Sequence, residues 1–210
     1  MGEAAAIGLR AHSGWAALVA IAGPSRSPSV VERRIIQLAD PTMAGSKQPY
    51  HAAEPLKLED AEKLVARCLE RTYRLAQDAL GRTVDALQKK GHPVNACGLV
   101  LASGRALPSL AGILASHAMI HAAEGELFRQ ALAQAGEQCG LLVLGVKERE
   151  LFSRAERDLD FLTAAIEQQL RKLGRSIGPP WRQDEKYAAL VGWLALANAS
   201  RKSKSMSRHA

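Results

Sequence analysis

The sequence predicts an α/β domain built on a mixed five-stranded sheet with helices on both faces. The first part of the chain holds three short apolar segments separated by turn residues, which is typical of strands joined by hairpins. From about residue 58 onward, helical periodicity alternates with two more apolar segments, which is typical of strands joined by helical crossovers. With 210 residues, of which 47% are hydrophobic, the chain can fill one core, and we expect a single domain over residues 1–200.

The first three strands are predicted from their apolar character and from the turns between them. Residues 5–22 contain two apolar segments on either side of a Ser-Gly step, which favours a hairpin. A break rich in proline, glycine and serine at 23–28 precedes a third strand at 30–40. The sequence from there to about Pro55 has no regular period, and we expect it to form a loop.

The rest of the chain predicts three helices and two strands before a last helix. Apolar side chains recur at intervals of three and four from Leu58 to about Lys90, which predicts an amphipathic helix with Gly81 as a candidate break. Gly174 is the expected stop of the penultimate helix. The remaining elements are strands at 96–103 and 141–146 and helices at about 116–138, 150–173 and 184–200.

The positive charge is concentrated near the end of the sequence. The chain has 28 Lys and Arg against 21 Asp and Glu, a net charge of +7. Four of the basic residues and no acid lie in 201–210, so the remainder holds 24 against 21, or +3. We expect residues 201–210 to be a basic disordered tail, with a phosphate-attracting arm as the alternative.

Several protein classes are excluded by what the sequence lacks. It has no run of about 18 uncharged apolar residues, so we expect no membrane-spanning helix. The first residues include Glu3 and Arg10 and do not resemble a secretory signal. Cys68, Cys97 and Cys139 are too widely spaced for a disulfide framework or a zinc ribbon. We therefore expect a cytoplasmic protein of bacterial type with no membrane partner.

The order of these elements resembles the ribonuclease H-like superfamily, which includes Holliday-junction resolvases, transposases and actin-like ATPases. At the level of topology the resemblance covers roughly residues 5–199. Residues 7–16 (IGLRAHSGWA) resemble the first hairpin of uncharacterised families of this fold, in which a Gly, an aliphatic residue and an Asp end strand one and a Gly-Trp opens strand two. Residues 184–189 (DEKYAA) resemble the acid-led, alanine-rich last helix of resolvase-like members.

The resemblance implies a cluster of carboxylates that holds two divalent cations, and this sequence departs from that pattern. Arg10 stands where the acid of strand one belongs, and 102–105 (Ala-Ser-Gly-Arg) supplies no acid after the fourth strand. Only Asp184 occupies an expected acid position. Because one acid cannot hold two metal ions and a guanidinium repels a cation, the resemblance implies a member without nuclease activity. No GxxxxGK[ST] phosphate loop supports an ATPase either.

The helix predicted at 116–138 carries three polar side chains on the face that we expect to be buried. With an advance of about 100° per residue, His117, His121 and Glu124 fall within the arc of the apolar residues Ile120 and Ala123. Burying such groups without partners costs several kcal/mol, so something must satisfy them.

We expect these side chains to line a pocket at the carboxyl edge of the sheet, where open α/β sheets bind ligands and where Arg10 and Asp184 should converge. The start of the helix favours an anion there. The candidate catalytic residues are His117, His121, Glu124 and Asp184, and the candidate ligand-binding residues are Arg10, His12, His51 and Trp181.

Three functions stay open at this point. The pocket could bind a phosphate-bearing small molecule or nucleic acid, with additional nonspecific attraction from the tail. Alternatively, the protein is a hydrolase that uses His117 or His121 as a base oriented by Glu124, or a metal bound to the two histidines. Their i, i+4 spacing suits metal binding, but the HExxH pattern is absent, so a divalent metal is not the favoured cofactor. In the third hypothesis the protein is a structural scaffold, and the polar cluster only locks the helix to the sheet.

Overall fold

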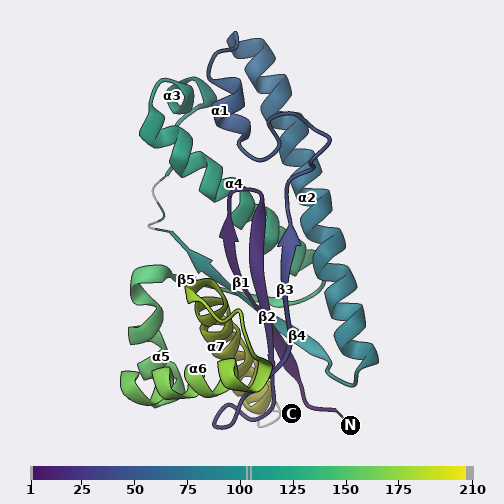
Figure 1. Ribbon diagram of the computed structural model, residues 1–210, viewed down its shortest axis with the longest axis vertical. Coiled ribbons are helices and arrows are strands. Elements are labelled where there is room, and N and C mark those ends of the chain that lie inside the picture. The colour runs from purple at the N-terminus through teal and green to yellow at the C-terminus, as the bar shows by residue number, and fades with distance from the viewer. Residues whose placement is uncertain (1, 103, 105, 207–210) are drawn as a thin grey trace.

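The computed structural model describes residues 2–102, 104 and 106–206, and its centre is a mixed sheet (Figure 1). Among these residues the sheet has five strands in the order β3-β2-β1-β4-β5. The first three strands form an antiparallel meander, whereas β4 and β5 run parallel to β1. The predicted fold class is therefore confirmed. The strands are β1 (Ala5–His12), β2 (Trp15–Ala22), β3 (Ser29–Gln37), β4 (Val94–Leu101) and β5 (Leu142–Lys147).

Helices cover both faces of the sheet. On one face lie α2 (Leu58–Lys89) and α4 (His117–Gln138), together with the short α1 (Pro49–Ala53) and α3 (Leu110–Leu114). On the other face lie α5 (Leu151–Leu159), α6 (Thr163–Ile177) and α7 (Gln183–Met206). A single 3-10 turn, η1 (Glu148–Glu150), joins β5 to α5. Within the described part of the chain, no helix has both the length and the hydrophobicity that spanning a bilayer requires.

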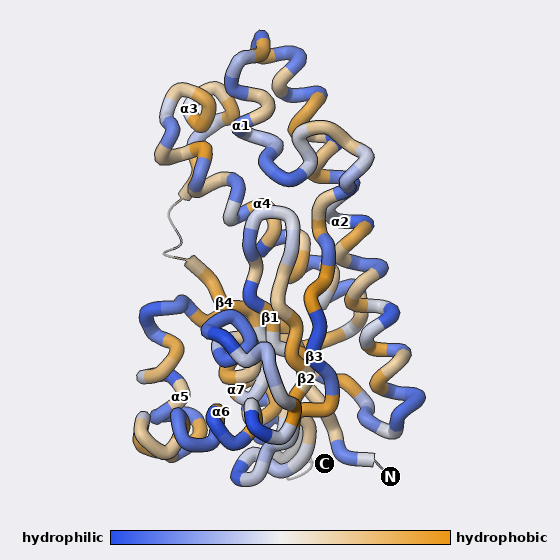
Figure 2. The backbone as a smooth tube through the Cα atoms, in the orientation of Figure 1, coloured by the Kyte–Doolittle hydropathy of each residue, from blue (hydrophilic) through white to orange (hydrophobic). Residues whose placement is uncertain are grey.

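The two cores follow from the alternation of side chains along the strands. In β1, Ile7 and Leu9 are buried under α2 and α4, whereas Ala6 is buried on the side of α7. β4 repeats this pattern, with Leu99 on the first side and Val100 on the second. Figure 2 shows hydrophilic and hydrophobic stretches alternating along α2, as expected for a helix with one buried face.

α7 lies directly on β1 and β4 because glycines remove the side chains between them. A Cβ atom on Gly8 would lie 1.8 Å from the carbonyl oxygen of Ala188, and one on Gly98 would lie 2.2 Å from that of Val191. From the helix side, a Cβ atom on Gly192 would lie 2.9 Å from the backbone nitrogen of Gly8. Backbone therefore meets backbone here, and the first turn of α7 is held over the carboxyl end of β1.

The hairpin between β1 and β2 forms at the predicted Ser-Gly step. Gly14 has φ = 82°, a left-handed conformation that glycine adopts without strain. Its carbonyl oxygen accepts hydrogen bonds from the backbone nitrogens of Leu38 and Ala39, which follow β3. The turn is thus anchored to the next strand, and the carboxyl end of β1 has a defined position.

The segment expected to form one helix at 150–173 forms two. Asp160 adopts a left-handed conformation (φ = 58°, ψ = 49°) and ends α5, and α6 starts at Thr163. Gly174 does not stop α6, which continues to Ile177 and ends at Gly178 (φ = 75°). The role of Gly174 is packing, because a Cβ atom there would lie 2.3 Å from Cδ1 of Trp181.

Other boundaries also differ from the expectation. The segment between β3 and α2, where a loop was expected, contains α1, and the connection after β4 contains α3. α2 continues through Gly81 without a break. α7 extends to Met206 and so enters the segment 201–210, which was expected to be a disordered tail. Residues 207–210 lie outside the described part of the chain.

Candidate functional site

Charged side chains meet where the parallel strands β1, β4 and β5 end. Arg10, near the end of β1, lies between two carboxylates, and its side chain is only 15% exposed. Its Nη2 donates to both carboxylate oxygens of Glu148 at 3.2 Å, and its Nη1 lies 3.0 Å from Oδ1 of Asp184. The guanidinium also lies over the ring of Tyr187, 4.8 Å from its centroid. Arg10 is therefore a fixed, neutralised cation at this edge.

His12 extends the same network. Its Nε2 lies 2.8 Å from Oδ1 of Asp184, and its ring stacks on Trp15 with the centroids 4.3 Å apart. A single carboxylate oxygen of α7 thus holds two side chains of β1. The prediction that Arg10 and Asp184 converge on this edge agrees with these distances.

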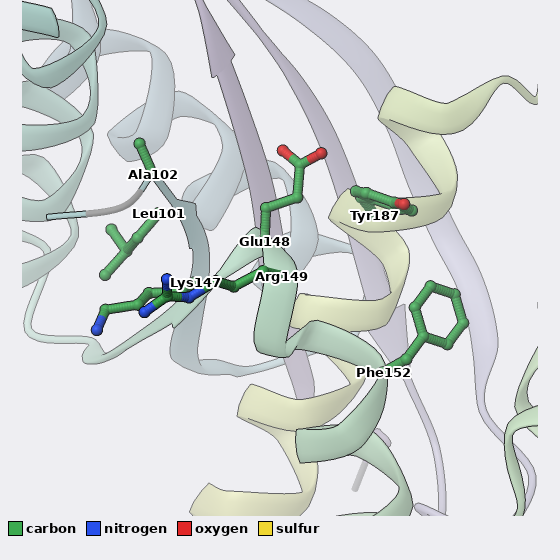
Figure 3. A pocket seen from close by; sticks show the side chains of 7 residues that line it. All are labelled: Leu101, Ala102, Lys147, Glu148, Arg149, Phe152 and Tyr187. Atoms are coloured by element: carbon green, nitrogen blue, oxygen red, sulfur yellow. The ribbon is translucent and has the colours of Figure 1, made fainter.

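A cavity of about 540 Å³ lies beside this network (Figure 3). Glu148 stands in the middle of the view, with Tyr187 of α7 on one side of it and Lys147 and Arg149 extending on the other. The two basic side chains are 40% and 70% exposed and contact only Glu150 among the ion pairs of the described residues, at 3.8 and 3.4 Å. The cavity is lined by Leu101, Ala102, Lys147, Glu148, Arg149, Phe152 and Tyr187.

Three histidines form a second cluster, at the start of α4. His117 and His121 lie one turn apart on α4, with their Nε2 atoms 3.0 Å apart. His51 comes from α1, and its ring centroid is 5.4 Å from that of His117 and 4.7 Å from that of His121. One nitrogen of each ring lies within 4.8 Å of the others, so the three can be ligands of one metal ion.

Glu124 lies beneath this cluster and is 2% exposed. Its Oε1 accepts hydrogen bonds from the backbone nitrogens of Tyr50 and His51, at 2.8 and 3.1 Å, and faces Nδ1 of His51 at 3.3 Å. Its Oε2 is buried and has no hydrogen-bond partner among the described residues. Burial raises the pKa of Glu124, although the donors of Tyr50 and His51 oppose that shift.

The single pocket expected from the sequence is therefore two separate clusters. Among the described residues, no hydrogen bond, ion pair or ring contact joins Arg10 or Asp184 to His117, His121 or Glu124. Figure 1 shows why: α4 begins beside α1 and α3 and reaches the sheet only with its later turns. The start of the helix therefore does not lie at the edge where β1 ends.

The expected burial of the two imidazoles is also wrong. His117 and His121 are exposed, whereas Ile120 and Glu124 on the same helix are buried. The face of α4 that was predicted to be buried is covered only where another element packs on it. α1 packs on Glu124 but leaves both histidines exposed. The expectation thus holds for the carboxylate and fails for the imidazoles.

Trp181 lies in neither cluster. Its Nε1 donates to the carbonyl oxygen of Leu170 at 2.9 Å, and its ring packs on Gly174, so it holds the turn before α7 against α6.

Glu148 and Tyr187 were not identified as site residues from the sequence. Glu148 directly follows the last parallel strand, and this position at the carboxyl edge could have identified it.

No family model and no curated protein matches this sequence. Among solved structures, Thermus thermophilus RuvC in complex with a Holliday junction substrate is similar, with a TM-score of 0.50 and 9% identity over 94% of this chain and 96% of that one. The structure of Thermus thermophilus RuvC gives 0.49 and 10% over the same shares, and an Aquifex aeolicus member of the Ppx/GppA family gives 0.36 and 9% over 73% and 38%. The first likeness shows a fold similar to the ribonuclease H-like fold of RuvC.

Proposed function

We propose that this protein is a ribonuclease H-like domain without nuclease activity that binds the phosphates of nucleic acid at the edge where β1 and β5 end. The observation that carries the proposal is the position of Arg10 between Glu148 and Asp184. The resemblance implies divalent cations among carboxylates at this edge. Here a guanidinium that belongs to the chain pairs with both acids, so a metal ion would have to displace it.

Loss of the metal site does not remove a capacity to bind phosphate. Lys147 and Arg149 border the cavity, and both are exposed enough to reach a ligand. The rings of Phe152 and Tyr187 line the same cavity and offer an apolar wall on which a base or sugar can pack. Proteins that bind single strands combine basic side chains with aromatic rings in this way.

Nucleic acid is favoured over a small phosphate-bearing molecule for two reasons. The similar fold of RuvC occurs in complex with a Holliday junction, which makes a branched DNA the first ligand to test. The second reason is the basic segment 201–210, which would add attraction for a long polyanion but little for a small ligand.

The test is fluorescence anisotropy of the full chain with labelled four-way junction, duplex and single-stranded DNA at several salt concentrations. We expect affinity that falls as salt rises, and a loss of about tenfold when Lys147 and Arg149 are both changed to Glu. The matched control changes Arg171 and Lys172, two exposed basic residues of α6, to Glu. A third variant, K202A/K204A/R208A, separates the contribution of the tail.

The outcomes distinguish the open alternatives. If only the tail variant loses affinity, the cavity is not the binding site. Absence of binding to all three DNAs at low salt would favour the scaffold. Incubation with Mg²⁺ or Mn²⁺ should leave the DNA intact, and cleavage that Asp184→Asn abolishes would overturn the assignment as a non-nuclease.

A further inference from the structure

We propose a second site: His51, His117 and His121 bind one divalent transition-metal ion of the zinc class, and Glu124 positions His51 for it. The site does not depend on nucleic-acid binding, because it lies in the cluster of α1 and α4 rather than at the edge of β1. The inference rests on the geometry of the three imidazoles and on the surroundings of the buried carboxylate.

The imidazole nitrogens are arranged as ligands. In a tetrahedral site with Zn–N bonds of about 2.0–2.1 Å, two ligand nitrogens lie about 3.3 Å apart. The Nε2 atoms of His117 and His121 are 3.0 Å apart, close to that value. One ring nitrogen of His51 lies within 4.8 Å of one nitrogen in each of the two, so a bound ion would have to draw the rings closer. The α4 side chains are exposed, which leaves them room to rotate. Three imidazoles favour Zn²⁺, Co²⁺ or Ni²⁺ over Mg²⁺ or Ca²⁺, which prefer oxygen ligands.

Glu124 has the position of an outer carboxylate in such a site. Metal-binding histidines commonly donate their second ring nitrogen to a carboxylate, which fixes the tautomer and the direction of the ring. Oε1 of Glu124 faces Nδ1 of His51 at 3.3 Å, which leaves Nε2 of His51 for the metal. The same oxygen accepts the backbone nitrogens of Tyr50 and His51, so it also holds the start of α1 in place.

The charge of Glu124 supports a nearby cation. Keeping a carboxylate that is 2% exposed in its charged form is costly without a nearby cation, and the ion pairs of the described residues join it to no Lys or Arg. Its only basic neighbour in these ion pairs is His51. A dication on the far side of the His51 ring would supply the missing positive charge through that ring.

The proposed ion would link α1 to α4 and keep one position open. Three protein ligands leave a fourth tetrahedral position, and because His117 and His121 are exposed, water can occupy it. Such an open site is compatible with the hydrolase alternative, but the proposal concerns binding, which can be measured without a substrate.

The experiment uses the full chain without an affinity tag, freed of metal by chelation and titrated with Zn²⁺ by calorimetry and with Co²⁺ by absorption spectroscopy. We expect one ion per chain and the absorption bands of tetrahedral Co²⁺. His117→Ala and His121→Ala should each weaken binding at least about tenfold, and Glu124→Gln by about 10- to 100-fold. Circular dichroism of the metal-free variants checks that each one folds.

Two matched controls make the result specific. His92→Ala removes a histidine outside the cluster, and Glu126→Gln changes a carboxylate two residues from Glu124 that pairs with Arg129. Neither should alter the affinity. The proposal is overturned if wild-type protein binds well below one ion per chain, if His92→Ala weakens binding as much as His121→Ala, or if the double variant H117A/H121A still binds Zn²⁺ with unchanged affinity.

Discussion

Nη1 of Arg10 and Oδ1 of Asp184 are 3.0 Å apart, and this ion pair joins the first strand to the last helix. Both side chains are partly shielded, with 15% and 27% exposure. Because Glu148 approaches the same guanidinium from η1, directly after β5, the three residues connect three elements of the fold. An arginine that satisfies two acids in this way is part of the structure of the edge, besides any role in binding.

Changing Arg10→Asp should convert this edge into a metal-dependent one. The substitution places a carboxylate beside Glu148 and Asp184, and repulsion among the three should lower stability by about 2 kcal/mol in the absence of divalent ions. We expect the melting temperature to rise on addition of Mn²⁺ by more than it does in the wild type. Scanning fluorimetry with Arg149→Asp as the control measures this, and equal responses of the two variants would argue against carboxylates that can share a cation.

Two glycine substitutions should have opposite effects on stability, because Gly8 lies against the backbone of α7 and Gly81 lies against nothing. Gly8→Ala places a Cβ atom 1.8 Å from a backbone oxygen of α7, so the helix must move, at a cost of about 3 kcal/mol or more. Gly81→Ala in α2 meets nothing within 4 Å and should stabilise the protein by about 0.5–1 kcal/mol. Urea unfolding of both variants checks this, and a Gly8→Ala protein as stable as the wild type would contradict the contact.

Substitutions of Glu124 and His121 should differ in their effects on the stability of the metal-free protein. Glu124→Ala leaves the backbone nitrogens of Tyr50 and His51 without their acceptor, which should cost about 1–3 kcal/mol. His121→Ala removes an exposed ring and should change stability by less than about 0.5 kcal/mol. Thermal unfolding in the presence of a chelator tests the difference. A large loss in His121→Ala would favour the scaffold alternative, in which the polar cluster holds the helix in place.

Asp40 makes part of the stability dependent on pH. The hydroxyl and backbone nitrogen of Thr42 donate to its Oδ1 at 2.7 and 2.9 Å, and Nε of Arg71 donates to Oδ2 at 2.6 Å. These contacts lower the pKa of Asp40 from 3.8 to about 2. Because the folded state binds this proton more weakly than the unfolded state, the stabilisation is present above about pH 4 and is lost as pH falls through about 2.

The measurement is the stability of Asp40→Asn against that of the wild type across this range. We expect the variant to be less stable near neutral pH and to lose less stability between pH 4 and pH 2. Asp60→Asn, at an exposed carboxylate of α2, serves as the control and should follow the wild type. Parallel curves for the wild type and Asp40→Asn would show that this carboxylate does not contribute to the acid response.

The sheet was predictable because its signals are local. Two apolar segments on either side of a Ser-Gly step determine β1 and β2, and the resemblance carried by the order of the elements indicated the position of Asp184. The break at Asp160 was not predictable in this way, because the surrounding sequence keeps a helical period through it. A left-handed Asp depends on how α5 and α6 both pack on α7, which periodicity does not record.

The candidate site was predicted only in part for a similar reason. A helical wheel shows which side chains share a face but not how far the covering element extends along the helix. His117 and His121 share a face with Ile120, yet the sheet does not reach them. Their partner His51 lies in α1, a helix too short to leave a periodic signal.

The packing of α7 on the glycines of β1 and β4 also has a consequence for the synthesis of the chain. One apolar face of the sheet, with Ala6, Ala17 and Val19, belongs to strands that precede Gln183–Met206 in the sequence. During translation the part of this face that α7 covers, on β1, β2 and β4, therefore stays exposed until the residues of α7 have left the ribosome. We expect nascent chains that stop before residue 183 to be prone to aggregation and to need a chaperone, because they expose this apolar surface.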